Sequence, residues 1–149
     1  MFSGKVLQGR VAIVTGAGQG IGAAVARAYG EQGGQVAVVD WNGESAEKVA
    51  AAIRARGGRA RAFACDVADR ARVEAMAAEV AAALGPVDVL VNNAGITRTA
   101  MLHKMTPHQW EQVLAVHLTG SFNCLQAVVG GMMERKQGWI INTVSAAGI

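Results

Sequence analysis

Three glycines mark the stretch of sequence with the clearest chemical meaning. Gly16, Gly20 and Gly22 follow an apolar run, residues 11–14, that is typical of a buried strand. A helical pattern comes next, with one apolar face formed by Ile21, Ala24, Val25 and Ala28. A glycine-rich turn between strand and helix lets the backbone approach a diphosphate, and the amides and dipole at the helix start favour its negative charge. The stretch predicts a site for a nucleotide diphosphate, in preference to glycines that serve helix packing alone.

An acidic residue stands where a partner of this loop is expected. Asp40 comes twenty residues after Gly20 and ends a second apolar run, residues 35–39. In a strand–helix–strand unit, such a carboxylate is placed to accept hydrogen bonds from the adenosine ribose of a dinucleotide. It would repel a 2′-phosphate, and the next residues, 41–43 (Trp-Asn-Gly), bring no positive charge to neutralise one. The sequence therefore predicts a dinucleotide site that prefers NAD to NADP.

With these features the sequence resembles the classical short-chain dehydrogenase/reductase family. Gly16, Gly20 and Gly22 match the family's Gly-xxx-Gly-x-Gly spacing. Its other motifs follow in order: Asp66-Val67, Asn92-Asn93-Ala94-Gly95, and Ser145 after Gly138-Trp139-Ile140-Ile141-Asn142. Residues 95–98 and 101–105 further resemble the beta-ketoacyl carrier-protein reductase branch, and the resemblance covers essentially all 149 residues.

The resemblance implies a role for each motif. Asp66-Val67 would contact the adenine ring, the Asn92–Gly95 stretch would shape the cofactor site, and Ser145 would be the catalytic serine. The expected cofactor-binding residues are Gly16, Gln19, Gly20, Ile21, Gly22, Asp40, Trp41, Asp66, Val67, Asn93, Ala94 and Gly95. The expected catalytic residues are Ser145 and His117, and no metal site is expected.

His117 is a departure from the family pattern. The family usually carries Asn here, within Asn-x-x-Gly, whereas this chain reads His117-Leu118-Thr119-Gly120. In the family that Asn helps to hold a water in the proton relay. A histidine could hold a water and donate a proton, although its size and pKa differ from those of Asn. The alternative, a histidine packed between helix and sheet without a relay role, is equally favoured.

The second departure concerns the proton donor of the family. Its chemistry uses a Tyr-x-x-x-Lys segment a short way beyond the serine, and the only tyrosine in this chain is Tyr29, with Gly33 four residues on. Tyr29 therefore cannot take that role. We expect the chain to be the N-terminal portion of an NAD(H)-dependent reductase acting on a ketone or secondary alcohol, with a 3-oxoacyl thioester as one candidate. The alternative is a non-catalytic nucleotide-binding or interaction fragment.

Alternating strand and helix patterns must position these residues. Strands are expected at 11–14, 35–39, 59–65, 87–91 and 139–144. Helices are expected at about 21–32, 44–56 and 73–84, and as a long helix beginning at Thr106-Pro107 with Gln109 completing a capping box. This order predicts an α/β class, Rossmann-like doubly wound parallel sheet with helices on both faces. We expect one domain over 1–149, C-terminally incomplete and truncated after the fifth strand, with residues 139–144 as an exposed edge strand.

Composition narrows the partners. Hydrophobic residues make up 52% and charged residues 17%, which excludes a disordered chain. No uninterrupted apolar run is long enough to span a bilayer, so we expect a cytoplasmic protein without a membrane partner. The net charge of +3 is scattered apart from Arg54, Arg56, Arg59 and Arg61, which predict a solvated helix end rather than a nucleic-acid site. Cys65 and Cys124 lack metal spacing and are expected to be buried thiols. The expected partners are a small carbonyl or alcohol substrate and, in a full-length form, further copies of the chain.

Three other sets of residues give weaker patterns. Asp66 and Asp69 could be a carboxylate pair, but Asp69 is better explained as the start of a helix. Ser145 lacks the Gly-x-Ser-x-Gly context of a hydrolase nucleophile. His103 and His108 are expected to be exposed residues rather than metal ligands.

Overall fold

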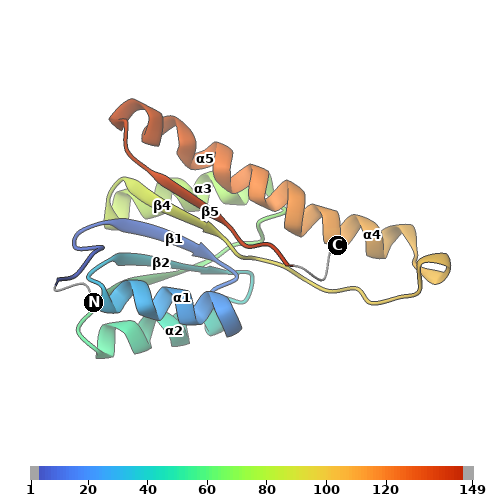
Figure 1. Cartoon of the computed structure of the whole chain (residues 1–149), viewed down its shortest axis with the longest axis horizontal. Helices are drawn as coiled ribbons and strands as arrows, with labels where there is room; N and C mark the ends of the chain where they lie inside the picture. The colour runs from blue at the N-terminus through green and yellow to red at the C-terminus, as the bar shows by residue number, and fades with distance from the viewer. Residues whose placement is uncertain (1–3, 146–149) are drawn as a thin grey trace.

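A computed structural model describes residues 4–145 and contains a single five-stranded parallel sheet (Figure 1). The strands are β1 (Val11–Thr15), β2 (Gln35–Asp40), β3 (Arg59–Ala64), β4 (Val87–Asn92) and β5 (Trp139–Asn142). Their order across the sheet is β3-β2-β1-β4-β5, and every pairing is parallel. β2 and β3 are added on one side of β1, and β4 and β5 are added on its other side, so the strand order reverses between β1 and β4. In open α/β sheets, ligands bind beside such a switch point, outside the carboxyl ends of the strands. The predicted fold class is confirmed.

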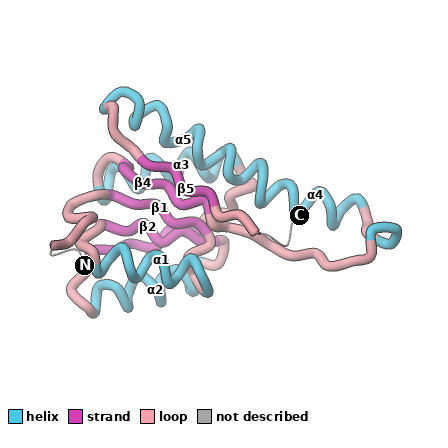
Figure 2. The backbone as a smooth tube through the Cα atoms, in the orientation of Figure 1, coloured by secondary structure: helices cyan, strands magenta, loops and turns pink. Residues whose placement is uncertain are grey.

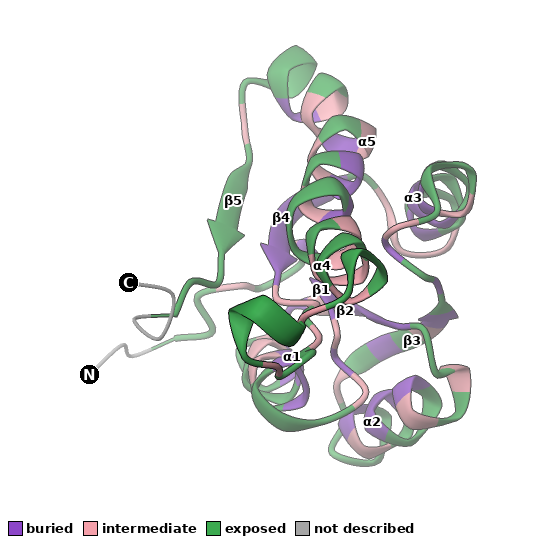
Figure 3. Cartoon of the chain, turned by 90° about the vertical axis from the view of Figure 1, so that its right-hand side faces the viewer, coloured by how far each residue is buried: buried purple, intermediate pink, exposed green. Residues whose placement is uncertain are grey.

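Helices cover both faces of the sheet (Figures 2 and 3). One face carries α1 (Gly20–Glu31) and α2 (Gly43–Ala55), and the other carries α3 (Arg70–Leu84) and α5 (Gly120–Arg135). The short helix α4 (Pro107–Leu114) and the 3-10 turn η1 (Leu102–Lys104) lie beyond the sheet, at the end of a long loop that follows β4 (Figure 1). That loop therefore begins at the same edge of the sheet as the carboxyl ends of β1 and β2.

The central strands are buried on both faces, and their residues alternate between two cores. Ile13, Val39 and Leu90 pack with Met76 and Val80 of α3 on one side of the sheet. The other core contains Val14, Val36, Val38, Ala23, Ala26, Val49 and Val91. Because both faces need apolar contacts, the strands are continuous hydrophobic runs rather than alternating ones, as parallel sheets require.

The predicted inner face of α1 is wrong by about one residue. Gly22, Ala23, Ala26 and Gly30 are buried, whereas Ile21 is 69% exposed. The cause is close backbone approach, since a Cβ on Gly22 would strike the carbonyl oxygen of Gly16, and one on Gly30 would strike the Ile53 side chain. Small residues therefore face the sheet and α2, and the apolar Ile21 is left at the surface.

Three helices begin with side-chain caps, and two of these, at Asp69 and Thr106, were predicted. Asn42 and Asp69 accept hydrogen bonds from the amides of Ser45 and Arg72, which confirms Asp69 as a helix start. Thr106 and Gln109 form the predicted capping box at α4, with Pro107 at its first position. These bonds satisfy amides that would otherwise lack partners within the helix.

One continuous helical rod runs from Pro107 to Arg135 and contains a π-helical segment, η2 (Ala115–Thr119), between α4 and α5. The rod is long and apolar enough to cross a bilayer by length and composition alone, a test that the core helices of soluble proteins also pass. Its inner residues, among them Cys124, Val128 and Met132, pack in the core formed with α3 and the sheet. The π segment was not predicted, and it falls at His117, the position where the sequence departs from the pattern of the family that it resembles.

β5 forms the edge of the sheet, as predicted, although it ends at Asn142 rather than at residue 144. All four of its residues are exposed, and its pairing among residues 4–145 is with β4 (Figure 3). The Asn92 amide donates to the Asn142 side chain at 2.9 Å and joins the ends of the two strands.

Candidate functional site

The glycine loop is folded tightly onto the end of β4. Gly16 has a φ of +62°, a conformation that favours glycine, and a Cβ there would lie 2.8 Å from the Cα of Ala94. A Cβ on Gly22 would lie 2.6 Å from the Asn93 side-chain nitrogen. The first and third glycines of the motif are therefore needed for packing between the loop, α1 and the strand end.

Gly20 differs from its two neighbours in the motif. Its φ is +55°, yet a Cβ built there would meet no atom within 4 Å, so the space beside it is open. Gln19 precedes α1 as its N-cap but makes no side-chain capping bond, unlike the caps of α2, α3 and α4. The first turn of α1 thus presents amides without a side-chain cap toward an open space, which is the requirement for binding an anion.

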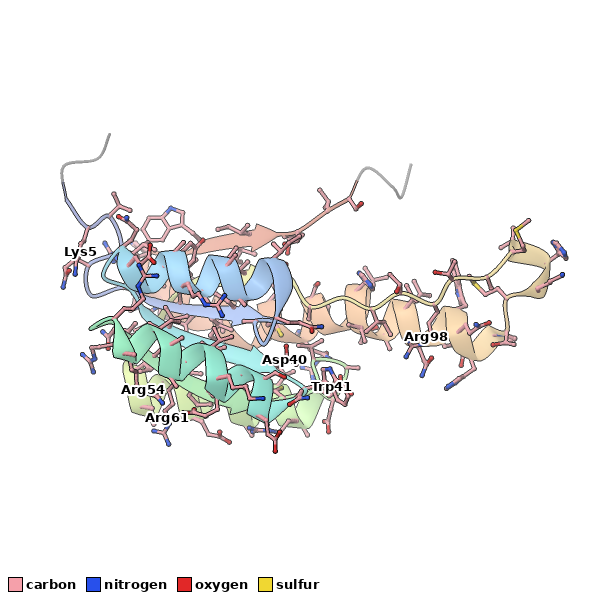
Figure 4. All side chains as sticks on the ribbon, turned by 90° about the horizontal axis from the view of Figure 1, so that it is seen from below. Lys5, Asp40, Trp41, Arg54, Arg61 and Arg98 are labelled. Atoms are coloured by element: carbon pink, nitrogen blue, oxygen red, sulfur yellow. The ribbon has the colours of Figure 1, made fainter. Side chains whose placement is uncertain are left out.

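Asp40 points at the glycine loop from the end of β2. Its side chain is nearly buried, at 7% exposed, with Oδ2 accepting from the Gly18 amide at 2.9 Å and Oδ1 from the Asn42 amide at 3.0 Å. Figure 4 shows Asp40 and Trp41 at the sheet end from which the α4–α5 rod extends. The predicted neighbourhood of loop and carboxylate is present, and Trp41 is largely exposed beside it.

Thr15, which sequence reasoning did not single out, ties the loop to β4. Its hydroxyl donates to the Val91 carbonyl at 3.3 Å and accepts from the amides of Asn93 and Ala94, each at 3.0 Å. The Asn93 side chain returns a bond to the Thr15 carbonyl at 3.1 Å. A hydroxyl residue directly before Gly16, at the buried end of a strand, was the available signal. Together these bonds fix the Asn93–Gly95 backbone against the glycine loop.

The Asp66-Val67 segment follows β3 and forms a turn of its own. The Asp66 carboxylate is exposed and accepts from the Ala68 amide at 2.9 Å. Val67 is buried, and its carbonyl accepts from the side chain of Asn123 at 3.0 Å. Asn123 is a second residue that the sequence analysis missed, because one buried amide on a helix leaves no pattern.

His117 lies against the loop that follows β4. A Cβ on Gly95 would be only 2.6 Å from the His117 Cε1, so the ring packs directly on that glycine. Its Nε2 is 3.0 Å from the Ile96 amide nitrogen and 2.8 Å from the Ile96 oxygen. The carbonyl of His117 in turn accepts from the Ser121 hydroxyl at 2.7 Å. His117 therefore joins the helical rod to the loop that follows β4.

The two hydroxyl residues discussed from the sequence lie at different ends of the sheet. Ser145 is exposed and follows β5 by three residues, on the carboxyl side of the strands, and residues 146–149 lie outside the described part of the chain. Tyr29 lies near the end of α1, on the opposite side, and burial raises the pKa of its hydroxyl. Tyr29 is therefore remote from the site, as its sequence position indicated.

The thiols are poor nucleophiles in this fold. Cys65 and Cys124 are both free and buried. Burial raises the pKa of Cys65 to about 11, and that of Cys124 to about 12. Both side chains stay protonated at neutral pH and act as small apolar core residues, as predicted.

The arginine group of the predicted helix end is largely occupied by local partners. Arg54 and Arg56 form ion pairs with Glu47 and Glu31, and Arg54 also donates to the Ala60 carbonyl. The guanidinium of Arg61 lies over the ring of Phe63, 5.9 Å from its centre. Figure 4 shows Arg54 and Arg61 away from Asp40.

The sequence and the structure both match known proteins. The family model described as short chain dehydrogenase matches residues 10–149. D-threitol dehydrogenase of Mycolicibacterium smegmatis is 48% identical over 95% of this chain and 54% of its own length. The 2,3-dihydro-2,3-dihydroxybenzoate dehydrogenase of Bacillus subtilis is 41% identical over 99% of this chain and 57% of its own length. A 3-oxoacyl-[acyl-carrier-protein] reductase of Staphylococcus aureus is 43% identical over 92% and 56%.

Solved structures agree with this result. A metagenomic short-chain oxidoreductase in complex with NADP superposes with a TM-score of 0.90 at 43% identity, over 95% of this chain and 65% of that one. The gluconate 5-dehydrogenase of Burkholderia cenocepacia, in complex with NADP and tartrate, gives 0.86 at 42% identity, over 93% and 54%. The chain spans a little over half the length of the curated relatives that it matches. With this fold, this loop geometry and a family match over residues 10–149, the chain belongs to the short-chain dehydrogenase family.

Proposed function

We propose that the chain is the nucleotide-binding portion of an NAD(H)-dependent oxidoreductase that transfers hydride between nicotinamide and a ketone or secondary alcohol. The observation that carries this proposal is the combination of three features at the glycine loop: the open side of Gly20, the uncapped start of α1, and the Asp40 carboxylate bonded to Gly18. The D-threitol and 2,3-dihydro-2,3-dihydroxybenzoate dehydrogenases and the 3-oxoacyl-[acyl-carrier-protein] reductase among its relatives support a carbonyl or alcohol substrate, and a 3-oxoacyl thioester is one candidate.

The residues of this chain fit a dinucleotide in distinct ways. The first-turn amides of α1 would hold the diphosphate, because nothing else caps them and a Cβ-free Gly20 leaves room. Asp40 would accept from the ribose hydroxyls with the lone pairs that Gly18 and Asn42 leave unused. The loop Asn93–Gly95, held by Thr15, would form the opposite wall. The bound nicotinamide would donate the hydride to a ketone or accept it from a secondary alcohol.

Ser145 would donate a hydrogen bond to the substrate oxygen and stabilise negative charge that develops there. The Tyr-x-x-x-Lys segment that the family uses for proton transfer does not occur in these 149 residues. General acid catalysis contributes on the order of 10²- to 10⁴-fold to such reactions. We therefore infer that these residues alone bind the cofactor and turn it over only slowly.

The preference for NAD over NADP rests on Asp40. A 2′-phosphate would approach a nearly buried carboxylate, and Trp41 and Asn42 offer no positive charge. Two matching structures contain NADP, so relatives with this fold bind the phosphorylated cofactor. The charge beside the ribose in this chain supports NAD.

Titration with NADH and NADPH, followed by nicotinamide fluorescence, tests this proposal. We expect NADH to bind more tightly than NADPH. Asp40→Asn should lower the affinity for NADH by about tenfold, because a hydrogen bond to a charged group is lost, and should reduce the ratio of NADH to NADPH affinity. Tighter binding of NADPH would contradict the assignment of Asp40.

Asp88→Asn is a matched control for this experiment. Asp88 is equally buried, at 7% exposed, and accepts from the Val11 amide at 3.0 Å, at the opposite end of the strands. This variant should lower the melting temperature without changing the cofactor preference. A loss of preference in both variants would indicate general unfolding rather than a role for Asp40.

We also propose that the complete protein is a homo-oligomer. Trp110, Leu114, Leu118 and Phe122 follow one another at intervals of four residues along the rod, and all are exposed. Large exposed apolar surfaces of this kind are typical of interfaces between chains.

A further inference from the structure

A buried amide on α5 contacts the segment that follows β3. Asn123 is 5% exposed and lies beside Cys124 in a helix whose other inner positions, Val128 and Met132, are apolar. Its side-chain nitrogen donates to the Val67 carbonyl over 3.0 Å. Burial of an amide is unfavourable unless it is hydrogen-bonded, so this contact determines how the side chain is placed.

The partner carbonyl needs this bond because it lies outside the sheet. β3 ends at Ala64, and the pairing of β2 with β3 ends at Asp40 and Ala64, so Val67 is beyond the last ladder pair. Its carbonyl faces the helix instead, where Asn123 meets it. A buried carbonyl without a donor would destabilise the turn.

The same turn of the helix also makes close backbone contact. A Cβ on Gly120 would lie 2.6 Å from Cγ2 of Val67, so only glycine lets the helix approach this side chain. Gly120 and Asn123 are three residues apart and therefore share a helix face. One face of α5 thus holds Val67 by shape and by a hydrogen bond.

We propose that Asn123 is a positioning residue for the cofactor. Its hydrogen bond to Val67 holds the Asp66-Val67 turn in the position that contacts the adenine end of the nucleotide. The inference rests on the proposed function and on the family resemblance of the Asp66-Val67 motif, which implies that the adenine ring lies beside this turn. Within the turn the Asp66 carboxylate accepts from the Ala68 amide, and Asn123 holds the Val67 carbonyl next to it. Asn123 acts through Val67 and does not touch the ligand itself.

The test is titration of the chain with ADP, which carries adenine, ribose and diphosphate but no nicotinamide. Asn123→Ala should lower the affinity for ADP by about fivefold, the loss expected for one hydrogen bond. Asn123→Asp keeps the shape but places an acceptor against the Val67 carbonyl, so it should weaken ADP at least as much. Val128→Ala, a buried position on the same helix, should lower the melting temperature without weakening ADP.

Amide hydrogen exchange gives a second measurement without any ligand. The amides of Ala68 and Asp69 are bonded within the turn. They should exchange faster in Asn123→Ala than in Val128→Ala. Equal exchange and equal ADP affinity in the two variants would overturn the inference, and so would a wild-type chain that does not bind ADP. A chain that binds ADP and responds to Asn123 but ignores nicotinamide would support the inference and contradict the proposed function.

Discussion

The Nε2 atom of His117 lies within hydrogen-bonding distance of both polar groups of Ile96, 3.0 Å from its amide nitrogen and 2.8 Å from its carbonyl oxygen. One imidazole nitrogen either accepts or donates, so His117 satisfies one of these groups at a time. Which group it bonds depends on the tautomer. In both cases the contact joins η2 to the loop after β4 and occupies Nε2 with a backbone partner.

Substitution of His117 tests this contact. His117→Ala should lower the free energy of unfolding by about 1 kcal/mol, because a hydrogen bond is lost. His117→Asn carries a donor and an acceptor on one side chain and should retain part of that stability if it reaches Ile96. Urea unfolding measures both variants. Equal stability of His117→Ala and the wild type would show that the contact contributes nothing.

The glycine motif should separate stability from cofactor binding. Gly22→Ala forces a Cβ against the Gly16 carbonyl, so overpacking should cost about 1–3 kcal/mol. Gly20→Ala meets no atom and should cost about 1–2 kcal/mol for its left-handed backbone alone. The new methyl would occupy the open space beside α1, so NADH affinity should fall further than stability predicts.

Melting temperature and NADH titration on the same samples check the glycine prediction. Gly57→Ala is the control, because its φ is +81° with no atom within 4 Å, in the turn after α2. This variant should match Gly20→Ala in stability and bind NADH normally. If both variants lost NADH affinity equally, the space beside Gly20 would not be the diphosphate site.

The sequence predicted the parts of the fold that follow from periodicity and composition. Continuous apolar runs gave β1, β2 and β4, and the spacing of Val73, Met76, Ala77 and Val80 gave the buried face of α3. The inner face of α1 was missed because close contact through Gly22 and Gly30 outweighs hydrophobic pattern, and glycine carries no hydrophobic signal. Boundaries differed by one or two residues at most strands and helices.

The site was predictable to the extent that it consists of loops at strand ends. Gly16, Asp40 and Asn93 follow apolar runs, and parallel strands bring such ends together. Thr15 and Asn123 were missed because each acts on backbone groups remote in sequence, Val91 and Val67, which no local pattern reveals. The π segment was missed as well, and it contains His117, whose ring contacts the loop after β4.

The two thiols predict a loss of stability at alkaline pH. Their pKa values are raised in the folded chain from 9.0 to about 11 for Cys65 and about 12 for Cys124. The folded state therefore holds their protons more tightly than the unfolded state. The protonated thiols therefore contribute to the free energy of unfolding. Their contribution is fully present below pH 9 and is lost as the pH rises toward 11 and 12, by about 1 kcal/mol per pH unit for each thiol.

Urea midpoints at pH 8 and pH 10.5 measure this effect. In the Cys65→Ala Cys124→Ala double variant the decrease between the two pH values should be smaller, although overall stability falls because of the cavities. Tyr29 changes stability with the same sign and is present in both chains, so the difference between them isolates the thiols. An identical decrease in both chains would contradict the prediction.

The exposed edge of β5 predicts self-association of the chain. Trp139, Ile140 and Ile141 are exposed, the strand carries no charge, and only its β4 side is paired among residues 4–145. Unprotected edges of this kind pair with other chains. Ile141→Lys places a charge on the edge at an exposed position and should shift sedimentation velocity profiles toward the monomer.

Leu118→Lys distinguishes this edge from the apolar face of the rod. Leu118 is also exposed, but it lies in η2, away from β5 in sequence. If the edge drives association, Ile141→Lys disperses the chain at a concentration where Leu118→Lys stays associated, because a lysine on the rod leaves the strand free to pair. If instead Leu118→Lys dispersed the chain and Ile141→Lys stayed associated, association would be assigned to the Trp110–Phe122 face of the rod. A charge on that face would separate the rods of two chains and leave the β5 edge unaltered.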